Sequence, residues 1–130
     1  EPAPEGTLMA AAEDRAKFSE PLAADHGSAL TDLVDIARGA IVSRVLATSG
    51  GGNVTLFAFD AEQGLSEHTA PFDALVQLVT GTLEVKIGEN EIHLQPGEIV
   101  RMPANVPHAL RAPEPCRMLL TMLREPKTEE

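Results

Sequence analysis

The fold is decided by residues 83–94, which read LEVKIGENEIHL. Residues 83–87 alternate apolar and charged side chains, and residues 91–94 do the same, which is the period of a strand with one buried face. The Gly-Glu-Asn loop between them predicts a hairpin. By this alternation Ile92 and Leu94 face the core and His93 faces outward.

Segments with the same short period lie on both sides of this hairpin. Three consecutive glycines and the Pro96-Gly97 pair supply turns between them. About eight short strands separated by such turns predict an all-β antiparallel sandwich or barrel. The other expected strands are 41–47, 54–59, 75–79, 99–102, 108–111 and 117–123.

The chain divides into three parts by composition. Residues 1–29 are expected to form an N-terminal extension that is partly helical, because Thr7 can cap an Ala-rich helix that runs to about Lys17. Residues 30–125 form one β-domain, and residues 126–130 form a flexible tail. A length of 130 residues fits a single domain.

Composition excludes several classes of function. The chain has 20 acidic and 10 basic residues, so its net charge of −10 opposes nucleic-acid binding. No apolar run approaches the roughly 20 residues of a spanning helix, so we expect no membrane partner. Cys116 is the only cysteine, which leaves no internal disulfide and no cysteine-based zinc site, and a reducing cytoplasm is the expected location.

Two stretches are more specific than the general pattern. Residues 64–74 read GLSEHTAPFDA, and residues 96–108 read PGEIVRMPANVPH. Together they resemble the two motifs of the cupin superfamily, and the resemblance to small single-domain bacterial cupins spans Ile41 to Leu123. It implies a double-stranded β-helix, also called a jelly-roll barrel, preceded by a short helical segment.

The resemblance also implies a metal site, of which half is missing. Cupins hold a divalent metal with two histidines and a glutamate from the first motif and a histidine from the second. His68 and His108 occupy the first and last of these positions, whereas Ala70 and Ala74 stand at the other two. Any Zn, Ni, Fe or Mn held by His68 and His108 alone would bind weakly, since such centres normally have three protein ligands.

The turn residues of the motifs are better preserved than the ligands. Gly81, Gly97 and Pro103 match the cupin pattern. Glu62 and Asn105 replace glycines, and Asn tolerates the left-handed backbone conformation better than most residues.

Other side chains do not complete the ligand set by pattern alone. Asp73 is next to Ala74 but should point to the opposite face of its strand. His26 and His93 are expected to be ordinary structural histidines, and Cys116 a small buried apolar residue.

Three functions remain open. The leading hypothesis is a pocket in the barrel that binds a small molecule, with His68, His108 and Met102 as ligand-binding residues. Met102, Met118 and Met122, at strand spacing, are most simply core residues, although flexible thioethers also suit an adaptable pocket. The alternatives are a metal-dependent enzyme of dioxygenase, isomerase or decarboxylase type and a non-catalytic scaffold or assembly module.

Two expectations concern the surface. Arg101, Arg111 and Arg117 are candidate rim charges for an anionic ligand. The resemblance to small cupins implies a homodimer, often formed with an exchanged N-terminal strand. Leu30–Ile36 fits a helical stripe or such a strand, and we favour the strand because sheet edges need covering.

Overall fold

A computed structural model describes residues 21–125, which form nine strands and one short 3-10 helix. The predicted helix between Thr7 and Lys17 and the tail 126–130 lie outside the described residues. The strands are β1 (Ile41–Ser49), β2 (Gly52–Phe59), β3 (Gly64–His68), β4 (Asp73–Thr80), β5 (Leu83–Ile87), β6 (Asn90–Leu94), β7 (Ile99–Met102), β8 (His108–Arg111) and β9 (Cys116–Leu123).

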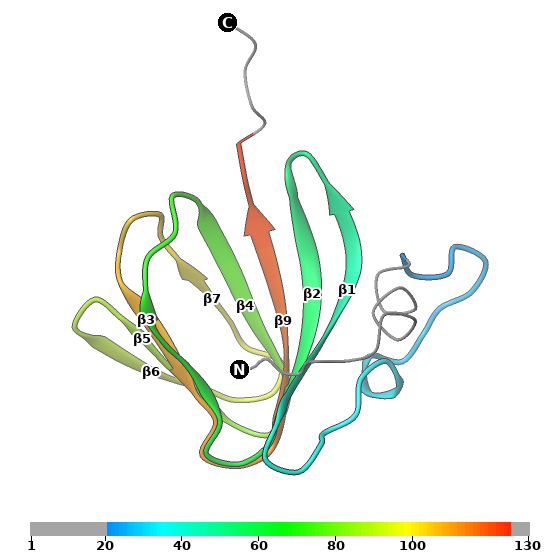
Figure 1. The fold of residues 1–130 in the computed structure, drawn as a ribbon, viewed down its shortest axis with the longest axis horizontal. Coiled ribbons are helices and arrows are strands. Elements are labelled where there is room, and N and C mark those ends of the chain that lie inside the picture. Colours follow the sequence, from blue (N-terminus) through cyan, green and yellow to red (C-terminus); the bar gives the residue numbers. More distant parts are fainter. Residues whose placement is uncertain (1–20, 126–130) are drawn as a thin grey trace, which may run out of the picture.

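The nine strands form two facing antiparallel sheets. One sheet has the order β1-β2-β9-β4-β7 and the other has the order β3-β8-β5-β6. The sheets meet at the lower end of the molecule in Figure 1 and diverge at the upper end, where β9 ends. This arrangement confirms the predicted all-β jelly-roll barrel.

The hairpin that decides the fold pairs as its sequence predicts. Leu83 lies opposite Leu94 and Val85 lies opposite Ile92, so the apolar residues of β5 and β6 share one face. The strand β3 is the one that alternation misses, because Gly64–His68 contains a single apolar residue.

The main core lies between the two sheets. Phe59, Leu78, Leu83 and Val85 are all at most 1% exposed. Burial of such side chains stabilises a fold by roughly 1.5–3 kcal/mol each.

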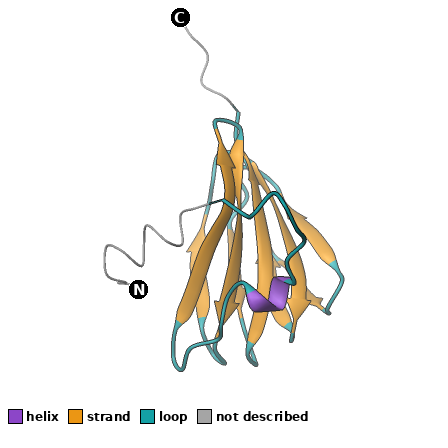
Figure 2. Ribbon diagram, turned by 90° about the vertical axis from the view of Figure 1, so that its right-hand side faces the viewer, coloured by secondary structure: helices purple, strands orange, loops and turns teal. Residues whose placement is uncertain are grey.

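A second apolar cluster lies on the outer face of the five-stranded sheet. Val34 is buried there against Leu46 and Leu56, beneath the segment that leads into β1. Arg44 and Arg117 hold this segment by donating hydrogen bonds to the carbonyl oxygens of Leu33 and Val34, respectively. Figure 2 shows the segment crossing the strands from outside.

The prediction of a strand over Leu30–Ile36 is wrong. Leu30–Asp32 form a 3-10 helix, and Leu33 N–H donates to Leu30 O. The apolar residues Leu30, Leu33 and Val34 are spaced as on a helical turn, and this spacing packs them together on the sheet. Within residues 21–125, no helix is long and apolar enough to span a membrane.

Candidate functional site

A cavity of about 200 Å³ lies between the two sheets and is lined by residues of both. Strands from both sheets contribute to its wall, and nine of its eleven lining residues are apolar. The polar exceptions are two histidines. The lining residues are Leu65, His68, Ala70, Phe72, Ala74, Met102, His108, Leu110, Met118, Leu120 and Met122.

Methionines form much of the wall contributed by the larger sheet. In β9, Met118, Leu120 and Met122 alternate toward the cavity, as a period of two requires. Ala74 on β4 lies opposite Met102 on β7 and opposite Met122 on β9. The small side chain of Ala74 is therefore flanked by two thioethers.

A β-bulge turns His68 into the cavity. Leu65 pairs with Leu110, but His68 pairs with His108, so β3 contains one extra residue between the two pairs. In a regular strand Leu65 and His68, three positions apart, would lie on opposite faces, and the bulge brings both to the cavity side. Bulges commonly re-aim side chains in this way beside functional sites.

The two cavity histidines are in direct contact. Their Nε2 atoms lie 3.1 Å apart, and their rings meet at 71° with centroids 4.3 Å apart. His108 is 5% exposed, whereas His68 is exposed at the end of β3. One imidazole thus lies inside the cavity, and the other lies at its mouth.

Backbone contacts fix the proton on the far side of each ring. His68 Nδ1 lies 2.8 Å from Ser66 O, and His108 Nδ1 lies 3.3 Å from Val106 O. A carbonyl oxygen only accepts, so each Nδ1 donates its proton to it. Both Nε2 atoms then carry lone pairs that face each other, and these repel unless a proton or a metal ion lies between them.

Burial acts mainly on the inner ring. Desolvation lowers the pKa of His108 below its ordinary value of 6.5, and the charge of nearby His68 lowers it further, while the hydrogen bond to Val106 acts in the opposite direction. Burial therefore favours the neutral form of His108.

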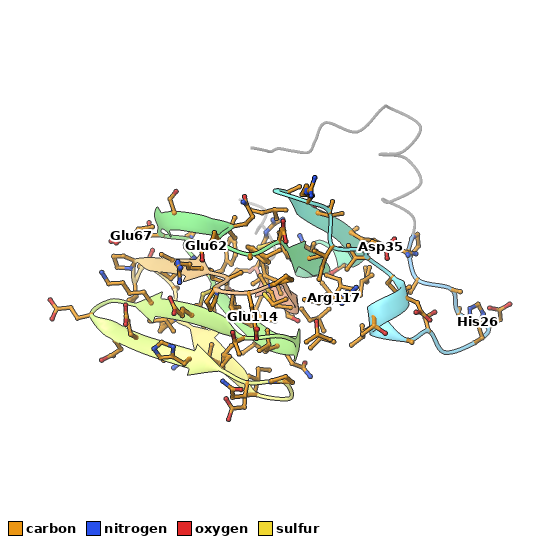
Figure 3. The ribbon with its side chains drawn as sticks, turned by 90° about the horizontal axis from the view of Figure 1, so that it is seen from below. His26, Asp35, Glu62, Glu67, Glu114 and Arg117 are labelled. Atoms are coloured by element: carbon orange, nitrogen blue, oxygen red, sulfur yellow. The ribbon has the colours of Figure 1, made fainter. Side chains whose placement is uncertain are left out.

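The remaining histidines lie outside the cavity. The His93 side chain is 61% exposed, 3.9 Å from Glu84, which confirms its outward orientation. His26 is also exposed and contacts its neighbour Asp25. Figure 3 shows His26 at the opposite end of the molecule from Glu67, which precedes the cavity histidine of β3.

Neither Asp73 nor Cys116 completes the site. Asp73 accepts hydrogen bonds from Ala104 N–H and from Arg101, away from the cavity. Cys116 is fully buried in the core, and desolvation raises the pKa of its thiol to about 11, so it is a poor nucleophile at neutral pH.

The three arginines expected at the rim make ion pairs or hydrogen bonds with other parts of the barrel, and none of them lines the cavity. Arg101 pairs with Asp73. Arg111 pairs with Glu62 and Glu84 across the sheet surface. Arg117 holds the segment on the outer face, as described above. The expectation that they form a rim for an anionic ligand is not supported.

The sequence model of the cupin domain matches residues 55–122, more than half of the chain. This chain belongs to the cupin family. A conserved protein of unknown function from Streptococcus pyogenes is 29% identical, with a TM-score of 0.79 over 84% of this chain and 96% of that chain. A cupin 2 conserved barrel domain protein from Leptotrichia buccalis is 31% identical, with a TM-score of 0.69 over 72% of this chain and 45% of that chain.

A third structure is similar to this chain in fold only. A cupin superfamily protein from Desulfitobacterium hafniense is 23% identical, with a TM-score of 0.77 over 82% of this chain and 98% of that chain. No curated protein matches this sequence. The family is therefore shown, whereas the activity of this cupin has to be argued from its own residues.

The backbone of this cupin keeps the turns even where it lost the glycines. Glu62 has a φ of 71° and Asn105 a φ of 65°, both in the left-handed region. The cupin pattern has glycine at both of these positions. The local geometry is therefore maintained at a cost in backbone strain that is larger for Glu62 than for Asn105.

The residues present do not fit the metal centre of the family. Across residues 21–125 no group of three His, Cys, Asp or Glu side chains is placed to hold a metal ion. Ala70 and Ala74, at the lost ligand positions, both line the cavity. The site retains two converging imidazoles and has exchanged the other two ligands for apolar surface.

Sequence reasoning named Met102, His68 and His108, and the structure brings all three to one cavity. Met118 and Met122 were expected mainly in the core but also line the cavity, and Phe72 and Leu120 were not expected there. Alternation along β9 would have grouped Leu120 with the two methionines, but only the pairing of strands shows that this face is the cavity wall.

Proposed function

We propose that this cupin binds a small, largely apolar molecule that carries one acidic or hydrogen-bonding group. The apolar body would occupy the methionine-lined cavity, and the polar group would meet His68 and His108. The observation that carries the proposal is an apolar cavity whose only polar side chains, among residues 21–125, are two imidazoles with converging Nε2 atoms.

The size of the cavity limits the ligand. An apolar cavity of about 150 Å³ is large enough to bind benzene. This cavity, at about 200 Å³, suits a molecule slightly larger, such as benzoate or a short branched carboxylic acid. It is smaller than the roughly 300–1,000 Å³ of typical drug-sized sites, so nucleotides and large cofactors do not fit inside it.

The charge of the pair favours an acidic ligand group. When one proton is shared between the two Nε2 atoms, the pair carries a single positive charge at the mouth of an apolar cavity. A carboxylate placed there would accept a charge-assisted hydrogen bond, which is roughly twice as strong as a neutral one. Arg101, Arg111 and Arg117 are engaged elsewhere, so this charge is the one that recognises the ligand.

The test compares how three ring compounds stabilise the parent protein and one double variant. Benzoate, benzyl alcohol and toluene are added to the metal-free protein, and the thermal midpoint is measured. We expect benzoate to stabilise most, by about 1.4 kcal/mol at ten times its Kd. We expect the variant His68→Ala/His108→Ala to lose the benzoate effect, whereas toluene keeps its smaller one.

Two other outcomes separate the alternatives. If none of the three compounds stabilises the protein, the cavity is not a ligand site and the scaffold hypothesis gains. If benzoate acts equally on the double variant, the histidines are structural and the proposal fails in its main point.

An acid–base activity is a second candidate. The pair combines a buried imidazole, that of His108, with a more exposed one, that of His68. Such a pair could take a proton from a bound ligand and return it. Catalysis would be supported if turnover of a bound ligand disappeared in both His68→Gln and His108→Gln while one of these variants still bound benzoate.

A further inference from the structure

We infer that Arg124 is a second recognition residue at the mouth of the cavity and that it selects ligands with two acidic groups. The class of ligand is a dicarboxylic acid with an apolar middle, in which one group meets His68 and His108 and the other meets Arg124. This inference rests on the proposed ligand site and deepens it, because it names the class of molecule.

Arg124 continues the row of β9 side chains that form the cavity wall. Met118, Leu120 and Met122 line the cavity at every second position. Side chains two positions apart in a strand point to the same face, and Arg124 is two positions beyond Met122. Its backbone N–H donates to Gly51 O at 2.7 Å, so the strand pairing extends to this residue. The Arg124 side chain therefore leaves the sheet on the cavity side, one step beyond the wall.

The neighbouring strand places an aromatic ring against this arginine. Asp73 on β4 lies opposite Leu123 on β9, so the next pair in the same register is Phe72 with Arg124. Arg124 Cζ lies 5.5 Å from the centroid of the Phe72 ring, within the range of a cation–π interaction. Phe72 itself lines the cavity. The guanidinium is therefore held at the edge of the cavity wall.

The histidines and this arginine approach the same end of the barrel from different sheets. His68 is the last residue of β3, and residues 69–72 connect it to the start of β4, which pairs with the end of β9. The strand β3 belongs to the four-stranded sheet and β9 to the five-stranded one. Facing sheets lie roughly 10 Å apart, so one small molecule can contact side chains of both.

The guanidinium of Arg124 has donors available for an anion. Arg101 and Arg111 are ion-paired, and Arg44 and Arg117 donate to backbone carbonyls. Among residues 21–125, the only partner of the Arg124 side chain is the Phe72 ring. Contact with a ring leaves most of the five N–H donors of an arginine free. A carboxylate can accept two of them side by side.

The glycine loop between β1 and β2 fixes the position of Arg124. Gly52 has a φ of 141°, and a Cβ added there would overlap Met122 O, so the loop can approach β9 only with glycine at this position. The same approach lets Gly51 O accept the hydrogen bond from Arg124 N–H. Figure 1 shows this loop beside the end of β9. The backbone therefore holds residue 124 in place when its side chain is changed.

The test measures the affinity of the parent and of Arg124→Gln for four ligands by calorimetry. The ligands are benzoate, benzene-1,3-dicarboxylate, benzene-1,4-dicarboxylate and the monomethyl ester of whichever dicarboxylate binds better. We expect the better dicarboxylate to bind the parent roughly fivefold more tightly than benzoate. Its monomethyl ester should lose this advantage, because it lacks the second charge. In Arg124→Gln the dicarboxylate should bind no more tightly than benzoate.

The matched control is Arg38→Gln, the same substitution at another exposed arginine. Arg38 lies three residues before Ile41, at the end of the sheet where β9 begins and opposite to Arg124. This variant should keep the preference of the parent. The inference is overturned if the parent binds neither dicarboxylate more tightly than benzoate, if Arg124→Gln keeps the preference, or if Arg38→Gln loses it.

The proposed ligand site and this inference can be contradicted separately. Arg124→Gln leaves the histidines and the cavity wall unchanged, and benzoate has a single acidic group, so benzoate should bind this variant as it binds the parent. A protein that binds benzoate without preferring a dicarboxylate contradicts the inference alone. A parent that binds none of the four ligands contradicts the ligand site as well.

Discussion

The Nε2 atoms of His68 and His108 lie 3.1 Å apart, although the two residues are 40 positions apart in the chain. Their Nδ1 atoms are both committed to backbone carbonyls. The two Nε2 atoms are therefore left to converge as acceptors toward a ligand group that donates a proton.

Stability should depend on pH through His108. Its pKa is lowered in the folded protein relative to 6.5 in the unfolded chain, so the unfolded chain takes up the proton first as pH falls. We expect the free energy of unfolding of the metal-free protein to be constant near pH 8 and to fall below about pH 6.5, with a slope of at most about 1.4 kcal/mol per pH unit. Chemical denaturation at a series of pH values measures this.

The variant His108→Gln provides the control for that slope. It removes the titrating ring from the cavity, so the fall below pH 6.5 should become shallower. An unchanged slope in the variant would show that other groups control the acid sensitivity.

Restoring the lost ligands should restore binding of divalent metals. The parent chain should gain little thermal stability from Zn²⁺, Ni²⁺, Fe²⁺ or Mn²⁺, because it offers only two protein ligands. The variant Ala70→His/Ala74→Glu supplies the missing pair at positions that line the cavity. We expect it to bind one divalent ion per chain at least 100-fold more tightly than the parent, measured by calorimetry.

Each single variant serves as a control for the double one. Either change alone should give an intermediate affinity, since each adds one donor. Equal affinity in the parent and the double variant would mean that the cavity does not place these positions around a common point.

The turn at Gly81 should tolerate no side chain. Its φ is 82°, and a Cβ added there would overlap Pro115 O and the Cys116 side chain. We expect Gly81→Ala to lower the free energy of unfolding by about 2–4 kcal/mol. Gly50→Ala is the matched control, because a Cβ there meets nothing within 4 Å. Urea denaturation of both variants decides whether the effect is local.

The homodimer implied by the resemblance to small cupins remains a prediction. Ile99, on the edge strand β7, is 56% exposed, and Leu123 at the end of β9 is 48% exposed. We expect the protein to elute from size-exclusion chromatography as a dimer at micromolar concentration. Ile99→Lys should shift it toward the monomer if β7 contributes to the interface, and a monomeric parent would contradict the prediction.

Alternation predicted most of the fold because it is a local property. Strands such as Leu83–Ile87 carry their burial pattern in their own residues. Leu30–Ile36 was misassigned because its apolar spacing depends on which surface it covers. The outer face of the sheet, to which Arg44 and Arg117 hold it, is formed by residues far along the chain.

The site was predictable only in part, for a related reason. The motif positions placed His68 and His108 together, but the orientation of His68 depends on a one-residue bulge in β3. No local pattern in residues 64–68 indicates that bulge. Likewise, the flanking of Ala74 by Met102 and Met122 follows from the pairing of three strands, which the sequence of any one of them does not contain.

The central claim is that the cavity and its histidine pair form one ligand site, and a crystal structure of the protein soaked with benzoate tests it most directly. We predict the ring inside the cavity, in contact with Met102 and Phe72, and the carboxylate within hydrogen-bonding distance of the Nε2 atoms of His68 and His108. A cavity without benzoate at a saturating concentration, or a carboxylate bound away from both imidazoles, would contradict the account.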